Sequence, residues 1–244
     1  MSERTENPAD DQANILAGQR DYYRARAPEY DEWILRRGRY DHGPEMNARW
    51  FEETEQVRDA LIGLDIRGDV LELAAGTGHW TETLARTAAS VLALDASPET
   101  LAVARERLGR AGLAEKVRFE IADLFEWVPD RTYDAVVFGF WLSHVPDDRL
   151  DTFLATVASA LRPGGTVFWV DSLRQDSATA PDQPLPAEEE EVMTRRLNDG
   201  RTFQVIKRFR SGATYEAAFA RQGIDLTVAE TPTYFQHATG VRLA

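Results

Sequence analysis

The chain of 244 residues contains no cysteine. Disulfides, thiolate metal ligands and cysteine nucleophiles are therefore excluded. No apolar run reaches the roughly 18 residues that a membrane span requires. The polar, acidic segment 1–11 also lacks the apolar centre of a signal peptide. From these absences we expect a cytoplasmic location.

Positive charge is scarce as well. The 28 Lys and Arg residues stand against 41 Asp and Glu residues, which gives a formal net charge of −13. Such a balance repels phosphate backbones and anionic lipid headgroups, so neither nucleic acid nor a membrane is an expected partner. The four histidines do not cluster, and no metal site is expected. A monomer and a homodimer both remain open.

Short apolar runs alternate with helical patterns between residues 69 and 171. The runs are too short for buried helices and are rich in β-branched or aromatic residues, which predicts buried parallel strands at 70–73, 91–94, 117–121, 135–140 and 166–170. Two closing strands are predicted at 225–230 and 233–237. The pattern indicates an α/β fold, a doubly wound, Rossmann-like and mostly parallel seven-stranded sheet.

The segments on either side of this alternation are less regular. Residues 21–33 predict an aromatic helix that is broken near Pro28, and a second helix is expected at 45–62. Three prolines and an acidic run predict a loop at 174–191. Beyond it we expect a short helix at 189–197, either a strand or irregular chain at 203–209, and a helix at 213–222.

The segment from Val70 to Trp80 is typical of a ligand site. A buried strand that contains Glu72 runs into a turn of small residues, which are Ala74, Ala75, Gly76 and Gly78. Small residues let the backbone approach a ligand closely. Doubly wound sheets bind ligands at this edge, where the strands end and their order reverses.

The spacing of this turn disfavours a dinucleotide. The dinucleotide fingerprint G-x-G-x-x-G requires a third glycine or alanine. Counting from Gly76 places Thr81 there, and counting from Ala74 places His79 there. Trp80 also occupies the start of the helix, where a pyrophosphate needs room.

Acidic residues end the next two strands. Asp95 follows the glycine turn by about 20 residues, the position at which a carboxylate accepts hydrogen bonds from ribose hydroxyls. Asp123 follows the third strand and reaches the same edge of the sheet. The three acids predict a pocket for an uncharged adenosine that carries a cationic tail.

These segments resemble the class I S-adenosylmethionine (SAM)-dependent methyltransferases, in particular their small-molecule members. The matching segments are Glu-Leu-Ala-Ala-Gly-Thr-Gly (72–78), Leu-Asp-Ala-Ser (94–97), Ala-Asp-Leu (122–124), Tyr-Asp-Ala-Val-Val (133–137) and Leu-Arg-Pro-Gly-Gly (161–165). Ala74 departs from the family, which more often has its first glycine there. Residues 21–33 also resemble the aromatic N-terminal cap of many small-molecule members.

The resemblance implies SAM as the methyl donor and a small-molecule acceptor, a metabolite or a natural product. It also implies a division of the chain into a flexible N-terminus (1–11), a helical cap or lid (12–62) and a SAM-binding methyltransferase domain (63–244). The last would carry an acceptor-side insertion at about 174–210. Two alternatives stay open: a SAM-binding regulatory or scaffold protein without catalysis, and a protein or nucleic acid methyltransferase.

By the same resemblance, Glu72 and the turn backbone through Gly78 hold the methionine part of SAM. Asp95 binds the ribose hydroxyls, and Asp123 and the backbone of Leu124 face the adenine. The residues expected to bind the cofactor are Tyr22, Tyr30, Glu72, Ala74, Gly76, Gly78, His79, Asp95, Ala96, Asp123, Leu124, Phe140 and Trp141.

Three side chains are candidates for catalysis. Aromatic faces attract a sulfonium without competing as nucleophiles, and Tyr23 is one such candidate beside ordinary packing as the alternative. His144 follows the fourth strand and is the best placed general base, although a histidine there also serves to seat the loop. His42 is the second candidate base.

Overall fold

Seven strands form the central sheet of the computed structural model, which describes residues 8–244 of the chain. The strand order is β3-β2-β1-β4-β5-β9-β8, and only β9 runs antiparallel to both neighbours. The strands are β1 (Asp69–Leu73), β2 (Ser90–Asp95), β3 (Val117–Ile121), β4 (Tyr133–Gly139), β5 (Leu161–Ser172), β8 (Ile224–Glu230) and β9 (Phe235–Arg242). The predicted doubly wound, mostly parallel seven-stranded sheet is confirmed.

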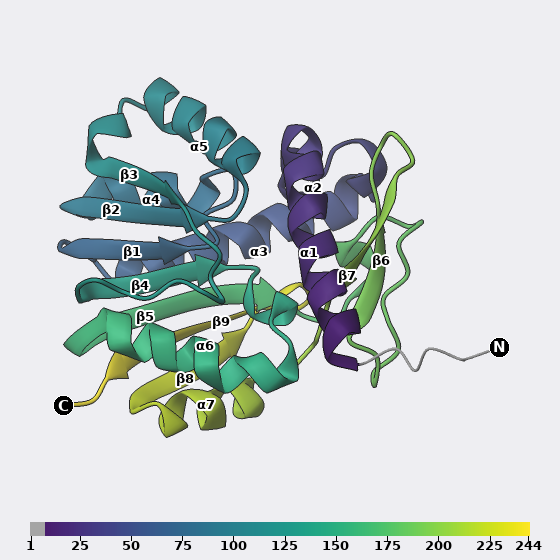
Figure 1. Cartoon of the computed structure of the whole chain (residues 1–244). Helices are drawn as coiled ribbons and strands as arrows, with labels where there is room; N and C mark the ends of the chain where they lie inside the picture. Colours follow the sequence, from purple (N-terminus) through teal and green to yellow (C-terminus); the bar gives the residue numbers. More distant parts are fainter. Residues whose placement is uncertain (1–7) are drawn as a thin grey trace.

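Helices cover both faces of this sheet, because alternate residues of each buried strand point to opposite sides. Val70 packs into the apolar cluster shared with α3 (Pro44–Gly63), α4 (His79–Thr87) and α5 (Pro98–Arg110). Leu71 packs into the other cluster, which contains α6 (Asp147–Ala160) and α7 (Gly212–Arg221). Figure 1 shows the strands between these two helical layers.

A third layer lies beyond the carboxyl ends of the strands (Figure 1). It consists of α1 (Pro8–Arg26), the 3-10 turn η1 (Ala27–Glu29), α2 (Tyr30–Ile34) and the ribbon of β6 (Val192–Arg196) and β7 (Thr202–Ile206). Gln19 on α1 ties the two parts together, because its Oε1 accepts the Ile206 backbone N–H at 2.9 Å. The aromatic helix is interrupted at Pro28, as its sequence predicts.

Four further 3-10 turns are η2 (Gly38–Tyr40), η3 (Ala114–Lys116), η4 (Leu142–His144) and η5 (Asp176–Ala178).

The prediction of a short helix at 189–197 is wrong, because residues 192–196 pair with 202–206 as β6 and β7. Met193 and Leu197 are buried against Tyr22 of α1, and such alternate burial stabilises a strand.

Residues 1–7 of the predicted flexible N-terminus lie outside the described residues, and α1 begins at Pro8. The division into a cap, a methyltransferase domain and an insertion stays a prediction. Within residues 8–244, no helix combines the length and the apolar character that a crossing of the bilayer demands.

The turn after β1 bends sharply through left-handed backbone. Ala74 has φ 54°, Gly76 has φ 55° and Gly78 has φ 83°. A Cβ atom on Gly78 would lie 3.0 Å from the Cβ of Ala104 on α5, so the close approach of α4 and α5 requires glycine there. Ala74 tolerates its conformation only at a cost, because left-handed backbone is unfavourable for any residue with a Cβ atom.

We therefore expect Ala74→Gly to raise the free energy of unfolding by about 0.5–1 kcal/mol, since glycine adopts positive φ without this strain. The matched control is Ala75→Gly, because Ala75 is buried in the same turn without a positive φ. That change should lower the free energy of unfolding by about 0.5–1 kcal/mol. Urea unfolding measures both, and an equal loss of stability in the two variants would contradict the expectation.

Glu72 lies on β1 directly before this turn and is 1% exposed. Its Oε2 has no hydrogen-bond partner among the described residues. Burial, with a contribution from the charge of Asp95, raises the pKa of Glu72 to about 8. At neutral pH the folded protein therefore holds a proton on Glu72 that the unfolded chain has lost.

This difference in proton binding makes stability fall as the pH rises from the unfolded pKa of 4.5 to the folded pKa of about 8. Glu72→Gln removes the titration. We expect its free energy of unfolding to gain on the order of 3 kcal/mol relative to wild type between about pH 5 and about pH 8. Unfolding curves across this range test it, with Glu106→Gln, exposed on α5, as the control for a lost charge. A difference that is the same at both ends of the range would show that Glu72 does not titrate in this way.

Candidate active site

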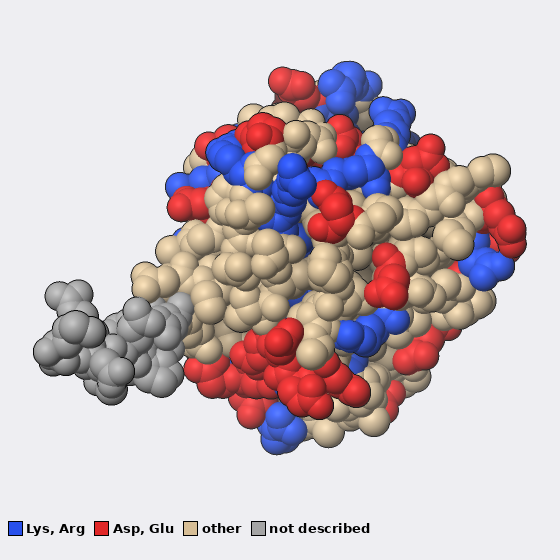
Figure 2. Space-filling model, turned by 90° about the vertical axis from the view of Figure 1, so that its right-hand side faces the viewer, with Lys and Arg blue, Asp and Glu red and all other residues tan. Residues whose placement is uncertain are grey.

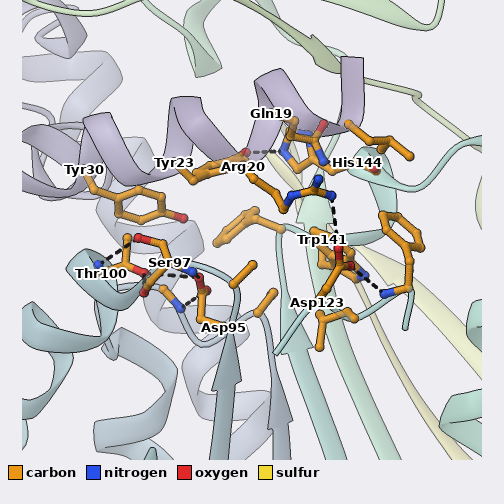
Figure 3. Close-up of a pocket in the computed structure, with 18 residues that line it drawn as sticks. Gln19, Arg20, Tyr23, Tyr30, Asp95, Ser97, Thr100, Asp123, Trp141 and His144 are labelled. Carbon is orange, nitrogen blue, oxygen red and sulfur yellow. Dashed lines mark hydrogen bonds and ion pairs between the residues drawn. The ribbon is translucent and has the colours of Figure 1, made fainter. Parts of the chain in front are cut away.

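The candidate site is a cavity of about 730 Å³ at the carboxyl edge of the sheet. Its floor is formed by the segments that follow β1, β2, β3 and β4, and α1 lies over it as a roof (Figure 3). The roof contributes four side chains at helical spacing, Leu16, Gln19, Arg20 and Tyr23. We call this space the edge cavity.

Asp95 lies on the floor of the edge cavity at the end of β2. Its Oδ2 accepts the Gly76 backbone N–H at 2.9 Å, and its Oδ1 accepts the Ser97 N–H at 2.9 Å and the Thr100 hydroxyl at 3.2 Å. A carboxylate offers about four acceptor positions. Asp95 is thus fixed in place and keeps capacity for a hydroxyl of a ligand. Burial raises its pKa.

Asp123 lies on the opposite side of the same floor (Figure 3). Its Oδ2 is 3.0 Å from the Arg20 guanidinium, and its Oδ1 accepts the Phe125 backbone N–H at 3.0 Å. This ion pair joins the roof helix to the segment after β3. The two side chains are 40% and 32% exposed, so the pair contributes little to stability and can open.

A second cavity of about 510 Å³ lies beside the edge cavity, between the sheet, α1 and the β6–β7 ribbon. We call it the inner cavity. Its wall includes Arg26, Arg195 and Lys207. The two cavities share four lining residues, Tyr23, Tyr30, Phe140 and His144. These residues therefore mark the boundary between the two spaces.

His144 and Tyr23 form a hydrogen-bonded pair at this boundary (Figure 3). His144 Nδ1 is 2.6 Å from the Ile206 carbonyl oxygen, which only accepts, so Nδ1 carries the proton. The Tyr23 hydroxyl then donates to the free Nε2 at 2.8 Å. Burial and the nearby Lys207 charge hold the pKa of His144 well below its usual range. The imidazole is thus neutral, and its free nitrogen is in contact with a phenol.

Most of the residues predicted to form the site line the edge cavity. They are Tyr23, Tyr30, Ala74, Gly76, Asp95, Ala96, Asp123, Leu124, Phe140, Trp141 and His144. Phe140 also has a left-handed backbone, with φ 56°, and lies at the end of β4 as Ala74 does at the end of β1. The two strained residues stand on the two sides of the point where the strand order reverses.

Five predicted residues do not line either cavity. Tyr22 is 1% exposed and packs against Met193 and Val205, so its side chain faces the ribbon. Glu72 lies on β1 before the turn, and Gly78 ends the turn where α4 begins.

The remaining two of the five are histidines. His42 Nε2 is 2.8 Å from the Thr179 carbonyl oxygen, so this side chain supports the wall of the inner cavity from behind. His79 Nε2 lies 3.0 Å from Asp31 Oδ1, and Arg107 contacts the other carboxylate oxygen at 2.5 Å. Although burial opposes it, hydrogen bonds from His79 and Thr77 lower the pKa of Asp31 to about 2. His79 thus joins α2 to the glycine turn and lines a smaller hollow beside it.

Several lining residues were not predicted from the sequence. The roof residues Leu16, Gln19 and Arg20 share the i, i+3, i+4, i+7 spacing with Tyr23, a pattern that indicates one helix face. Arg26, Arg195 and Lys207 offer no such signal, because they meet only after the ribbon folds over α1.

Comparison with known proteins identifies the fold. A family model described as a methyltransferase domain matches residues 70–165. The structure of a DhpI–SAH complex is 38% identical, with a TM-score of 0.74, and the match covers 94% of this chain and 97% of that one. A DhpI complex with SAM and HEP is 40% identical at the same TM-score, over 93% of this chain and 97% of that one.

The curated relatives match over a smaller share of the chain. Demethylmenaquinone methyltransferase of Tropheryma whipplei (strain Twist) is 34% identical over 105 residues, which is 43% of this chain and 42% of that protein. The chain spans about half the length of the curated relatives that it matches. Because the DhpI structures are 38% and 40% identical over 97% of their length, the family predicted from the motifs is confirmed, and the chain belongs to the class I SAM-dependent methyltransferases.

Proposed function

We propose that this chain transfers the methyl group of SAM to a small-molecule acceptor, with the donor in the edge cavity and the acceptor in the inner cavity. The observation that carries the proposal is that the two cavities adjoin and share Tyr23, Tyr30, Phe140 and His144. A methyl group crossing from one cavity to the other passes these four residues. Methyl transfer depends above all on holding the two reactants in line, which two adjoining cavities provide.

The edge cavity offers polar groups that suit SAM. In our proposal Asp95 accepts the ribose hydroxyls, Asp123 and Leu124 face the adenine, and the turn at Ala74 and Gly76 holds the methionine part. A Cβ atom on Gly76 would point toward the Tyr30 ring at 3.9 Å, so glycine keeps the space between turn and roof open. When bound, SAM supplies an electrophilic methyl group on a sulfonium, which the aromatic rings at the boundary attract.

The Tyr23–His144 pair has the geometry to receive a proton from the acceptor. The phenol oxygen accepts a proton from the acceptor as its own proton moves to His144 Nε2, which is free and 2.8 Å away. Burial raises the pKa of Tyr23 well above its usual range, so the phenol is not ionised beforehand. An acceptor that is already ionised needs no such transfer, and Tyr23 then positions it.

The small-molecule class of acceptor rests on the size of the inner cavity, about 510 Å³. The DhpI complex with SAM and HEP and the demethylmenaquinone methyltransferases support it as relatives. Figure 2 shows the face over the cap. Acidic side chains gather along its lower edge, and the rest of this face has both acidic and basic side chains. This face has no continuous basic surface for a nucleic acid, so we favour the small acceptor over that alternative.

Binding of the donor is tested by calorimetry with SAM. Asp95→Ala should weaken SAM binding by about 1–3 kcal/mol, because the ribose hydroxyls lose their acceptor. The control is Glu120→Ala, which removes a carboxylate from the neighbouring strand β3 outside both cavities. Wild-type protein that is folded but binds neither SAM nor SAH would overturn the proposed function.

Catalysis is tested with acceptors found by screening for methylated products. Tyr23→Phe should leave SAM affinity unchanged and lower kcat about 10²-fold, the usual contribution of a positioned proton-transfer group. Tyr133→Phe is the matched control, since this buried tyrosine of β4 lines neither cavity. Equal kcat in Tyr23→Phe and wild type across the pH range would exclude the proton transfer. The absence of any product from a SAM-binding protein would favour the regulatory alternative.

A further inference from the structure

Three cationic side chains converge on the inner cavity from separate elements. Arg26 ends α1, Arg195 lies on β6, and Lys207 follows β7. Arg26 and Lys207 are 6% and 5% exposed. Burial of a charge is costly unless a group of opposite charge compensates it. The partners of each cation therefore indicate what the cavity is built to hold.

Arg26 lacks such a partner among residues 12–244, the part of the chain whose side chains are described. No carboxylate lies within 4.0 Å of it, and its single hydrogen bond is a long one, 3.5 Å, to the Tyr40 hydroxyl. Its guanidinium carbon lies 4.7 Å from the centre of the Tyr30 ring and 5.5 Å from that of Tyr22. Burial raises the pKa of Tyr30 to about 12, so this ring does not supply a negative charge at neutral pH.

Arg195 is also without an acidic partner in the described part of the chain. It donates to the Thr179 hydroxyl at 2.7 Å and to Gln183 Oε1 at 2.8 Å, and both acceptors are neutral. These bonds hold the guanidinium at the wall without cancelling its charge.

Lys207 differs, because its Nζ lies 3.5 Å from Asp171 Oδ1 and donates to the Ser143 hydroxyl at 2.8 Å. Asp171 is fully buried and compensates this one charge. His144 adds no charge, because its imidazole is neutral. The inner cavity thus has an excess of two positive charges, one on Arg26 and one on Arg195.

From these contacts, and on the basis of the proposed function, we infer that the acceptor carries a dianionic oxyanion, such as a phosphate monoester, which Arg26, Arg195 and Lys207 bind in the inner cavity. Guanidinium groups suit this ligand, since their paired N–H groups match two oxygens of one oxyanion. A single carboxylate would compensate only half of the excess charge.

Calorimetry with inorganic phosphate tests this inference. Phosphate is titrated into protein saturated with SAH at constant ionic strength and a slightly alkaline pH, with acetate in a parallel arm. We expect saturable phosphate binding and at least about tenfold weaker acetate binding. Saturation with SAH keeps the donor site filled without turnover, and SAH affinity is measured separately for every variant.

Arg195→Met should weaken phosphate binding at least about tenfold and leave SAH affinity unchanged. Its neighbour Arg196 on β6 is exposed and lies outside the cavity, so Arg196→Met is the matched control and should bind phosphate as wild type does. Arg26→Met, with the exposed Arg24→Met as its control on α1, should give the same result. If Arg26→Met does not fold, the Arg195 pair still decides the matter.

Three outcomes would overturn the inference while the proposed function stands: no phosphate binding by protein that binds SAH, equal binding of acetate and phosphate, or loss of SAH affinity in Arg26→Met. The last would assign the guanidinium to the carboxylate of the donor. Failure of wild-type protein to bind SAH at all would instead refute the proposed function itself.

Discussion

Strands β1 and β4 are neighbours in the sheet, yet the chain leaves them toward opposite faces, and the whole site depends on this divergence. α4 follows β1 onto one face, and α6 follows β4 onto the other. No crossover helix can fill the crevice between them. The backbone adapts to the crevice with left-handed residues on both sides, Ala74 and Phe140, and the edge cavity opens directly above them.

Enclosure comes from the N-terminal helix and the β6–β7 ribbon rather than from the sheet. Gln19 links the two, and the Arg20–Asp123 ion pair holds the roof to the floor. The edge cavity is bounded on this side by the Arg20–Asp123 ion pair, whose side chains are 40% and 32% exposed, and such a pair opens at modest cost.

Charge is distributed unevenly between the two cavities. The edge cavity is lined by two carboxylates, Asp95 and Asp123, and one cation, Arg20, whereas Arg26 and Arg195 of the inner cavity have no acidic partner among the described side chains. Tyr23, Tyr30 and Phe140 separate the two environments with aromatic rings. A cationic donor on the acidic side and an anionic acceptor on the basic side would approach each other across this boundary, which orders the reactants before any bond changes.

The sequence by itself determined the sheet, the glycine turn and the acids at the strand ends. These features arise from local spacing, because a buried strand, a tight turn and a following helix each leave a pattern within a few residues. Residues 16, 19, 20 and 23 of the roof also follow a local pattern, the i, i+3, i+4, i+7 spacing of one helix face. Only the tertiary structure decided the rest. The helix predicted at 189–197 became β6 because a partner strand was available. Tyr22 packs against Met193 and not in the site. Arg26, Arg195 and Lys207 line one cavity although they are far apart in the sequence. Contacts between distant residues depend on how the layers pack, and no local pattern encodes them.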